Sequence, residues 1–336
     1  MTTVLPTRAL GTSGMDITTV GFGAWATGGG AYEFGWGPQD DAESIAAIQA
    51  AVTGGVNWID TAAVYGLGHS EEVVGRAVRG IPAGERPYVF TKCGMVWATR
   101  DEVPRRAAEP AQIRRELDAS LRRLGVERID LYQVHWPPED GTPIEAYWQT
   151  MLDLKAEGKI RAAGLSNHSA AELDTAERLG HVDSLQPPFS AIRRDTDAEE
   201  LPWCAQHGTG AIVYSPMQSG LLTGGFSEAR VAALPADDWR SRSRLFHGES
   251  LRRSTSLANS LAPIADRLGV SQGAVAIAWT LAWPGVTGAI VGARTAAQVE
   301  GWLPAAALTL SSADLDTIAA AIATTAAGTG PNRPPR

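Results

Sequence analysis

The chain alternates short apolar runs with longer amphipathic segments almost from end to end. The short runs are rich in Val, Ile, Leu and Ala and end at Gly, Pro or polar residues, which is typical of buried β-strands. Eight such runs are recognisable, at residues 20–24, 56–60, 88–91, 131–135, 162–166, 184–186, 211–214 and 289–291.

Helical periodicity fills the intervals between these runs. The predicted helices cover residues 42–53, 70–78, 111–124, 144–156, 170–179, 198–207, 272–282 and 296–301. Eight strand–helix alternations within about 300 residues predict an α/β fold, the (β/α)8 TIM barrel. A doubly wound sheet is the alternative, but the glycines at 21, 23 and 28–30 lack the spacing of its phosphate-binding turn.

Two segments stand outside the alternation. Residues 10–17 contain a Gly-rich turn between two short runs and predict an N-terminal β-hairpin. Residues 218–249 form a long loop after the seventh strand, which is unusual inside a compact domain and points to a functional role. A further helix is expected at 251–268. We expect one domain over residues 1–323 and, from its Gly, Pro and Thr content, a disordered tail over 324–336.

Composition narrows the functional classes. The net charge of −8 argues against nucleic-acid or anionic-membrane partners, which require a basic surface. No apolar run reaches the roughly 18 residues of a membrane-spanning helix. With only Cys93 and Cys204, the chain has no disulfide framework, and we expect a cytoplasmic protein. Lys92 could lower the pKa of Cys93, although a small buried hydrophobe is the simpler interpretation.

Candidate chemistry gathers at the ends of consecutive strands. Asp60 ends the second strand and Tyr65 follows it; Lys92 ends the third and His135 the fourth. In a barrel these ends share one mouth, and neighbouring strands are about 4.8 Å apart. A carboxylate, a phenol, an ammonium and an imidazole are therefore expected within reach of one another.

This set suits the reduction of a carbonyl group. As hydride reaches the carbon, the oxygen gains negative charge and needs a proton. We assign Tyr65 as the general acid or base, Lys92 as its electrostatic activator, Asp60 as the partner of Lys92, and His135 as the group that orients and polarises the carbonyl.

Zinc-dependent hydrolysis is a competing chemistry. His135, His168 and Asp60 are conceivable ligands. However, the chain has no closely spaced pair of histidines, and an ammonium beside the site opposes a dication.

The chain resembles the aldo-keto reductases. The matching motifs run in the family's order: 60–66 (DTAAVYG), 91–92 (TK), 134–137 (VHWP), 164–167 (GLSN), 186–188 (QPP), 214–224 (YSPMQSGLLTG) and 292–298 (GARTAAQ). Together with the N-terminal hairpin they span most of the chain. The segment 65–72 is most similar to the bacterial general-stress and inositol-operon-type branch. The family's catalytic tetrad falls on Asp60, Tyr65, Lys92 and His135.

The resemblance implies NADP(H) as the cofactor, bound across the barrel mouth. It places the carboxamide at Ser166, Asn167 and Gln186, and Tyr214 against the nicotinamide ring. Ser215, Met217, Ser219, Gly220 and Leu221 match the pyrophosphate stretch, and Gly292, Arg294 and Gln298 the loop that reads the 2′-phosphate. Arg240 can reach over the cofactor from the long loop, although an arginine there is as readily solvated.

One stretch departs from the family's pattern. Gly301 and Trp302 occupy the positions where Glu and Asn usually contact adenine. This change bears on the preference for NADPH over NADH.

An aromatic rim is expected to bind the substrate. Trp25, Trp36, Trp97 and Trp136, with Tyr32 and Phe34 beside them, lie in or near strand-end loops. Such walls fit a small carbonyl compound or a sugar. The sequence therefore predicts an NADPH-dependent aldehyde or ketone reductase. The alternatives are an NADP(H)-binding regulatory or sensor protein with little turnover, and a sugar or polyol dehydrogenase working in the oxidative direction. Substrate, direction and oligomeric state are left open.

Overall fold

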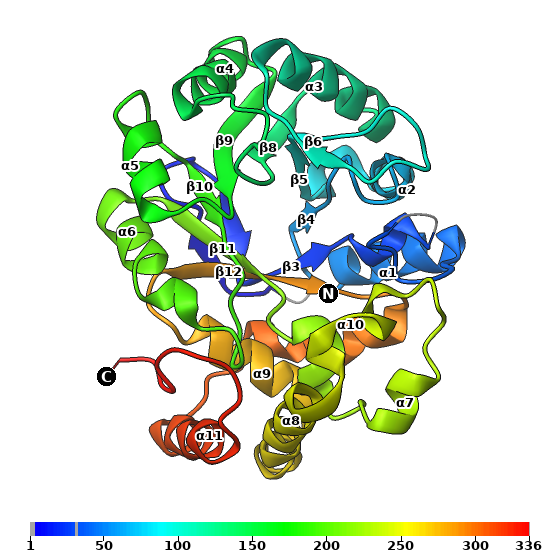
Figure 1. Ribbon diagram of the computed structural model, residues 1–336, viewed down its shortest axis with the longest axis vertical. Coiled ribbons are helices and arrows are strands. Elements are labelled where there is room, and N and C mark those ends of the chain that lie inside the picture. Colours follow the sequence, from blue (N-terminus) through cyan, green and yellow to red (C-terminus); the bar gives the residue numbers. More distant parts are fainter. Residues whose placement is uncertain (1–3, 31–32, 336) are drawn as a thin grey trace.

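Eight parallel strands close into a barrel in the computed structural model, which describes residues 4–30 and 33–335 (Figure 1). The order around the barrel is β3-β4-β5-β8-β9-β10-β11-β12, so each strand lies next to its neighbour in the chain. Their bounds are Val20–Gly23, Trp58–Asp60, Tyr88–Cys93, Ile129–Val134, Ile160–Ser166, Ser184–Gln186, Gly210–Tyr214 and Val286–Gly292. All eight predicted strands are confirmed, with ends that differ by up to three residues.

Helices form the outer ring and cover the strands (Figure 1). They are α1 Asp41–Thr53, α2 His69–Arg79, α3 Pro110–Leu124, α4 Ile144–Ala156, α5 Ala170–Glu177, α6 Glu200–His207, α7 Glu228–Ala232, α8 Gly248–Leu268, α9 Gln272–Leu281, α10 Ala296–Trp302 and α11 Ser312–Thr325. The short 3-10 helices of the described residues are η1 Ala26–Gly28, η2 Ala83–Glu85, η3 Asp195–Asp197, η4 Gln218–Thr223, η5 Trp239–Ser241, η6 Arg244–Phe246 and η7 Leu303–Ala306. Because both faces of each strand are buried, the strands read as apolar runs.

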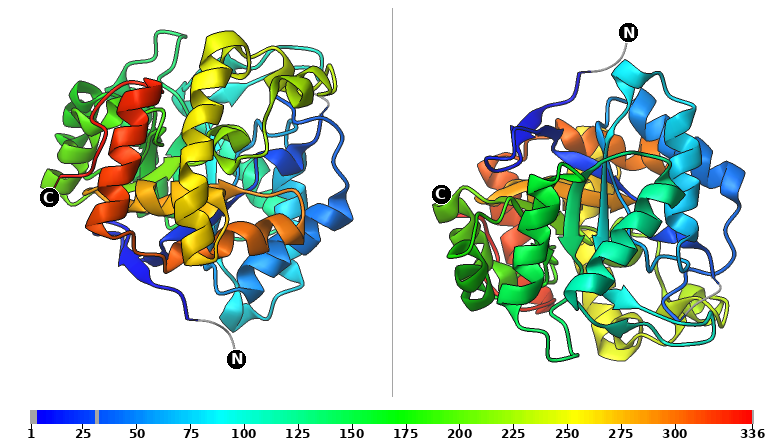
Figure 2. Two further views of the ribbon diagram at one scale, coloured as in Figure 1. Left: turned by 90° about the horizontal axis from the view of Figure 1, so that it is seen from below. Right: turned by 90° about the horizontal axis from the view of Figure 1, so that it is seen from above.

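The N-terminal hairpin plugs one end of the barrel. Strands β1 (Thr7–Ala9) and β2 (Asp16–Thr18) pair antiparallel, as predicted. Leu10, Met15 and Ile17 pack against the interior residues Trp58 and Phe90. Figure 2 shows the hairpin at the end of the molecule opposite the 218–247 segment. The carboxyl ends of the strands lie at the other end of the barrel.

Two connections at that open end are more structured than the sequence suggests. After β5 the chain forms a small antiparallel hairpin, β6 (Met95–Val96) with β7 (Arg105–Arg106), which the sequence analysis missed. The long loop folds into η4, α7, η5 and η6 and meets the 33–39 loop, where Trp36 bridges to Asp238 and the Trp239 N–H donates to the Gly35 carbonyl. The loop thus crosses part of the barrel mouth.

The segment from residue 324, for which composition predicts a disordered tail, continues the last helix and then follows the barrel. Thr324 and Thr325 belong to α11, and the residues that follow pack on the barrel. The buried Arg194 guanidinium donates to the carbonyls of Ala327 and Gly330. In the described part of the chain, no helix is long and apolar enough to cross a membrane.

Candidate active site

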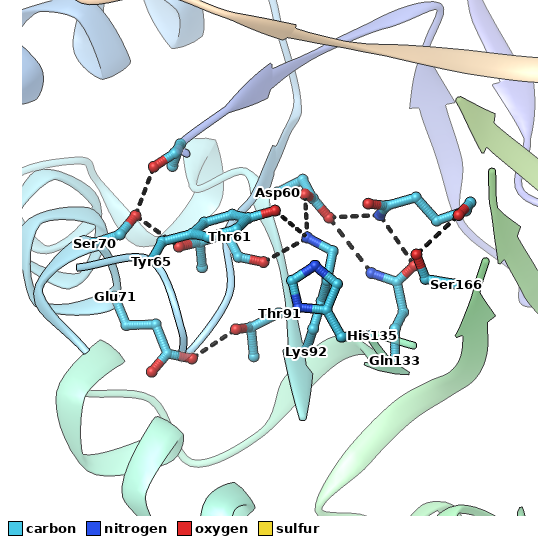
Figure 3. Close-up of polar contacts among 12 residues, drawn as sticks. Asp60, Thr61, Tyr65, Ser70, Glu71, Thr91, Lys92, Gln133, His135 and Ser166 are labelled. Atoms are coloured by element: carbon cyan, nitrogen blue, oxygen red, sulfur yellow. Dashed lines mark hydrogen bonds and ion pairs between the residues drawn. The ribbon is translucent and has the colours of Figure 1, made fainter. Parts of the chain in front are cut away.

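A buried ion pair forms the floor of the site. The Lys92 Nζ lies 2.5 Å from the Asp60 Oδ1, and both side chains are at most 3% exposed. It also donates to the Thr61 carbonyl at 2.8 Å and to the Tyr65 hydroxyl at 3.4 Å (Figure 3). These three partners account for the three N–H donors of an ammonium. Burial lowers the pKa of Lys92, and the Asp60 carboxylate opposes that shift.

The second oxygen of Asp60 is held by two amides. The Gln186 Nε2 donates to the Oδ2 at 2.9 Å, and the Gln133 Nε2 lies 3.4 Å from the same atom. Gln133 pairs in register with Lys92 on the neighbouring strand. Gln133 was not predicted as a site residue, although an amide inside the apolar run of β8 was a usable signal. Three donors therefore fix the position of the carboxylate.

Tyr65 projects from the loop after β4 over this floor. The Lys92 Nζ lies 5.1 Å from the centre of its ring. The loop comes so close to η1 that a Cβ on Gly66, whose φ is +62°, would lie 2.2 Å from the Gly28 carbonyl oxygen. Only glycine fits there, and this close approach fixes the path of the chain next to Tyr65.

His135 is the first residue after β8 and faces the tyrosine. The two ring centres are 5.7 Å apart and the planes nearly perpendicular (Figure 3). The His135 N–H donates to the Cys93 carbonyl, and its carbonyl accepts from the Asn167 Nδ2. Burial, helped by the charges of Lys92 and Arg106, lowers the pKa of His135 well below its ordinary 6.5. The imidazole is therefore neutral at neutral pH.

These groups open into a cavity of about 790 Å³. Its lining includes most of the predicted site residues: Trp25, Trp36, Asp60, Tyr65, His135, Trp136, Ser166, Asn167, Gln186, Tyr214, Ser215, Met217, Ser219, Gly220, Arg240, Gly292, Arg294 and Gln298. Lys92 lies beneath the lining. Phe34 and Trp302 join the lining as well.

Two expected residues, Leu221 and Trp97, do not line the cavity. Leu221 is fully buried and does not line the cavity. Trp97, expected on the substrate rim, is also absent from the lining, because the unpredicted β6–β7 hairpin brings Met95, Arg105 and Arg106 to the wall instead. Tyr32 falls outside the described residues.

Polar groups at the ends of β9 and β11 form one network. The Tyr214 hydroxyl donates to the Asn167 Oδ1, and the Asn167 Nδ2 donates to the Ser166 Oγ. The Ser166 Oγ in turn donates to the Gln186 carbonyl. Asn167 adopts a left-handed φ of +61°. The network fixes the amide of Asn167 and the ring of Tyr214 at the cavity wall.

The segment after β11 turns sharply toward the cavity. Ser215, Gln218, Ser219 and Gly220 all have positive φ angles, between 45° and 98°. Successive turns of this kind present backbone N–H groups to one side, which suits an anionic ligand.

Two arginines, Arg240 and Arg294, line the cavity at the loops of the barrel mouth. The Arg294 guanidinium donates to the Gln39 Oε1 at 2.6 Å and to the carbonyls of Trp36 and Pro38. Arg240 forms an ion pair with Asp238 and lies 4.5 Å above the Trp36 ring. Both therefore tie the mouth loops together. The sequence did not decide whether Arg240 is solvated. In the structure its side chain is only 11% exposed.

Comparison with known proteins decides the family. The model of the aldo/keto reductase family matches residues 19–323. The chain belongs to the aldo/keto reductase family. Two bacterial relatives cover most of it: aldo-keto reductase YhdN of Bacillus subtilis (35% identical, over 90% of this chain and 89% of the relative) and the NADH-specific methylglyoxal reductase of Escherichia coli (34%, over 91% and 94%).

Solved structures agree with this family. The glycerol dehydrogenase AKR11B4 of Gluconobacter oxydans has a TM-score of 0.86 at 34% identity, covering 96% of this chain and 97% of that one. The holo form of aldo-keto reductase AKR11C1 from Bacillus halodurans has a TM-score of 0.76 at 25% identity, covering 94% and 96%. The chain is thus an oxidoreductase acting on carbonyl or CH–OH groups, in a family that uses a nicotinamide cofactor.

The wall of the cavity fits such a cofactor. An aromatic ring fixed at one side, oriented amides beside it and a run of left-handed backbone suit a planar amide-bearing ring joined to a pyrophosphate. Over residues 4–30 and 33–335, no group of three His, Cys, Asp or Glu side chains is placed to hold a metal ion.

Proposed function

We propose that the protein catalyses NADPH-dependent reduction of an aldehyde or ketone, with Tyr65 as the proton donor. The observation that carries the proposal is the Asp60–Lys92–Tyr65 chain at the floor of the cavity, with His135 beside it. The cofactor, when bound, supplies the hydride for the carbonyl carbon. Side chains that the fold holds in place transfer the proton and orient the carbonyl.

The proton comes from the tyrosine hydroxyl. Lys92 places a positive charge 3.4 Å from that oxygen, which favours the phenolate left after the proton has gone to the substrate. Asp60 keeps the ammonium charged and in place. This arrangement lets one hydroxyl give a proton in reduction and take it back in oxidation.

The neutral His135 supplies a hydrogen bond to the carbonyl oxygen. Because its pKa lies well below 6.5, it does not compete with Tyr65 as a proton donor at neutral pH. A donor already oriented toward the developing alkoxide needs no reorganisation during the reaction. His135 thus orients the carbonyl while Tyr65 transfers the proton.

We assign cofactor binding to the part of the cavity wall formed by the ends of β9, β10, β11 and β12. Ser166 and Asn167 hold the carboxamide. Gln186, whose Nε2 is committed to Asp60, adds its Oε1 as an acceptor. Tyr214 stacks on the nicotinamide ring. Ser215, Met217, Ser219 and Gly220, which line the cavity, surround the pyrophosphate, and the buried Leu221 packs beneath them. Gly292 and Gln298 flank Arg294, which reads the 2′-phosphate, and Arg240 covers the cofactor.

The proposed preference for NADPH over NADH depends on Arg294, and substitution of this residue tests it. Its guanidinium would exchange the carbonyls of the 36–39 loop for the 2′-phosphate, whose geometry matches the guanidinium fork. Arg294→Ala should therefore raise the dissociation constant of NADPH at least about tenfold and change that of NADH by less than about threefold, as measured by fluorescence titration. Equal shifts for both cofactors would remove Arg294 from 2′-phosphate recognition.

A direct test of the activity uses the wild-type protein. NADPH oxidation with 4-nitrobenzaldehyde should be readily measurable at neutral pH. A protein that binds NADPH but oxidises none of it with a broad panel of aldehydes and ketones would instead fit a regulatory or sensor role.

The oxidative direction is a second candidate. A solved structure described as a glycerol dehydrogenase superimposes on this chain with a TM-score of 0.86. The same tyrosine can accept the proton of an alcohol. Comparing NADP⁺-driven oxidation of glycerol with NADPH-driven aldehyde reduction at one pH decides the direction, because faster oxidation would assign a polyol dehydrogenase.

A further inference from the structure

The β6–β7 hairpin brings two adjacent arginines to the cavity wall. Arg105 and Arg106 both line the cavity. Their hairpin follows β5, which pairs with β8, the strand before His135, whereas the 215–220 turn and Arg294 follow β11 and β12. The Arg106 guanidinium lies 4.5 Å above the Trp136 ring. The Arg106 carbonyl accepts the Glu139 N–H, which attaches the hairpin to the loop after β8. This charge therefore sits on the substrate side of the cavity.

Arg106 has spare hydrogen-bonding capacity. Its Nη1 contacts the Glu139 Oε1 at 2.9 Å, and the two side chains are 37% and 68% exposed. An exposed pair of this kind contributes little stability, and a guanidinium has five N–H donors. Arg105 has no ion-pair partner among the residues that the structure describes. The hairpin thus presents more positive charge than Glu139 neutralises.

The field of Arg106 reaches the reacting groups. Burial is the main cause that lowers the pKa of His135, and the charges of Lys92 and Arg106 lower it further. The centres of the His135 and Trp136 rings are 6.5 Å apart, and Arg106 lies 4.5 Å from the Trp136 ring, so a small molecule whose carbonyl faces His135 can extend along Trp136 toward the guanidinium. Trp136 beneath it offers a flat apolar surface for the part between.

We propose that the substrate carries a carboxylate as well as the aldehyde or ketone, and that Arg106, stacked on Trp136 and assisted by Arg105, binds that carboxylate. This proposal rests on the carbonyl reductase function above and names its substrate class. The guanidinium fork presents paired N–H groups, and a planar carboxylate can accept from two of them at once. Glu139 competes with the substrate for the same donors.

A matched pair of substrates tests the proposal. 4-Formylbenzoate and its methyl ester differ in charge, while the carbonyl and ring are kept. The wild-type protein should show the higher kcat/KM for the acid, and the ratio of acid to ester should fall as salt rises. Arg106→Met should lower that ratio about tenfold, and Glu139→Gln should raise it. Arg115→Met, on the exposed outer side of α3, is the control and should leave the ratio unchanged.

A binding measurement separates this proposal from the reductase function. Benzoate should quench the tryptophan fluorescence of the wild-type protein at lower concentration than benzamide, and Arg106→Met should abolish the difference. If neither formyl compound nor the broad panel of aldehydes and ketones is reduced, the reductase function fails, while the benzoate result still decides whether Arg106 forms a carboxylate site. A ratio unaffected by Arg106→Met, with benzoate and benzamide binding alike, would overturn the proposal.

Discussion

Single side chains at the barrel mouth carry the chemistry, and their ionisation sets its pH dependence. Burial with the charges of Lys92 and Arg106 holds the pKa of His135 well below 6.5, so the imidazole stays neutral as pH falls through the ordinary histidine range. We therefore expect kcat/KM for aldehyde reduction to be level between about pH 6 and pH 8. A step centred near pH 6.5 that disappears in His135→Asn would show that the histidine titrates normally.

The sequence was most informative about the individual side chains of the site. Asp60, Tyr65, Lys92 and His135 were predicted to meet, and the structure brings them together, because strand ends of a barrel share one mouth whatever the details of packing. The bonding of Gln186 to Asp60 was not foreseeable. Which way an amide points depends on its neighbours across the barrel, and these are far apart in sequence.

Between elements, Glu116 joins α3 to the turn between β5 and β6. Its Oε2 accepts the Gly94 N–H, and burial raises its pKa from the ordinary 4.5 to about 7. The folded state therefore keeps a proton on Glu116 over a range where the unfolded chain has lost it. That contribution to stability is complete below pH 4.5 and is lost as pH rises through 7.

Glu116→Gln removes this pH dependence. The melting temperature of the variant minus that of the wild type should rise between pH 5 and pH 8. Over the whole pKa shift from 4.5 to about 7, the free energy of unfolding of the wild type changes by roughly 3 kcal/mol, at 1.36 kcal/mol per pKa unit. Thermal unfolding followed by circular dichroism at both pH values measures it. A difference that is the same at pH 5 and pH 8 would place the titration of Glu116 outside this range.

Periodicity predicted the strands and helices well, and it failed where elements are short. The β6–β7 hairpin has only two residues in each strand, too few for an alternation to be recognised. Consequently Trp97 was expected at the cavity, and Arg105 and Arg106 were not. The long 218–249 loop was recognised by its length, but its pairing with the 33–39 loop depends on tertiary contacts.

For the whole molecule, the C-terminal segment acts as a clamp on the barrel. The Arg194 guanidinium is buried against the carbonyls of Ala191, Ala327 and Gly330, and Thr329 donates to Asp195. Deleting residues 328–336 should leave part of a buried charge without acceptors. We expect a loss on the order of 1–3 kcal/mol in the free energy of unfolding, measured in urea. Unchanged stability would instead fit the disordered tail expected from composition.

The central claim is that Tyr65 donates the proton in carbonyl reduction. The most direct measurement compares single-turnover NADPH oxidation with 4-nitrobenzaldehyde in the wild-type protein and in Tyr65→Phe. The dissociation constant of NADPH is determined for both. Loss of only the hydroxyl should slow the reaction by about 10²–10⁴-fold while NADPH binds as before. A Tyr65→Phe variant that turns over within a few-fold of the wild type would contradict the account and assign the proton to another group.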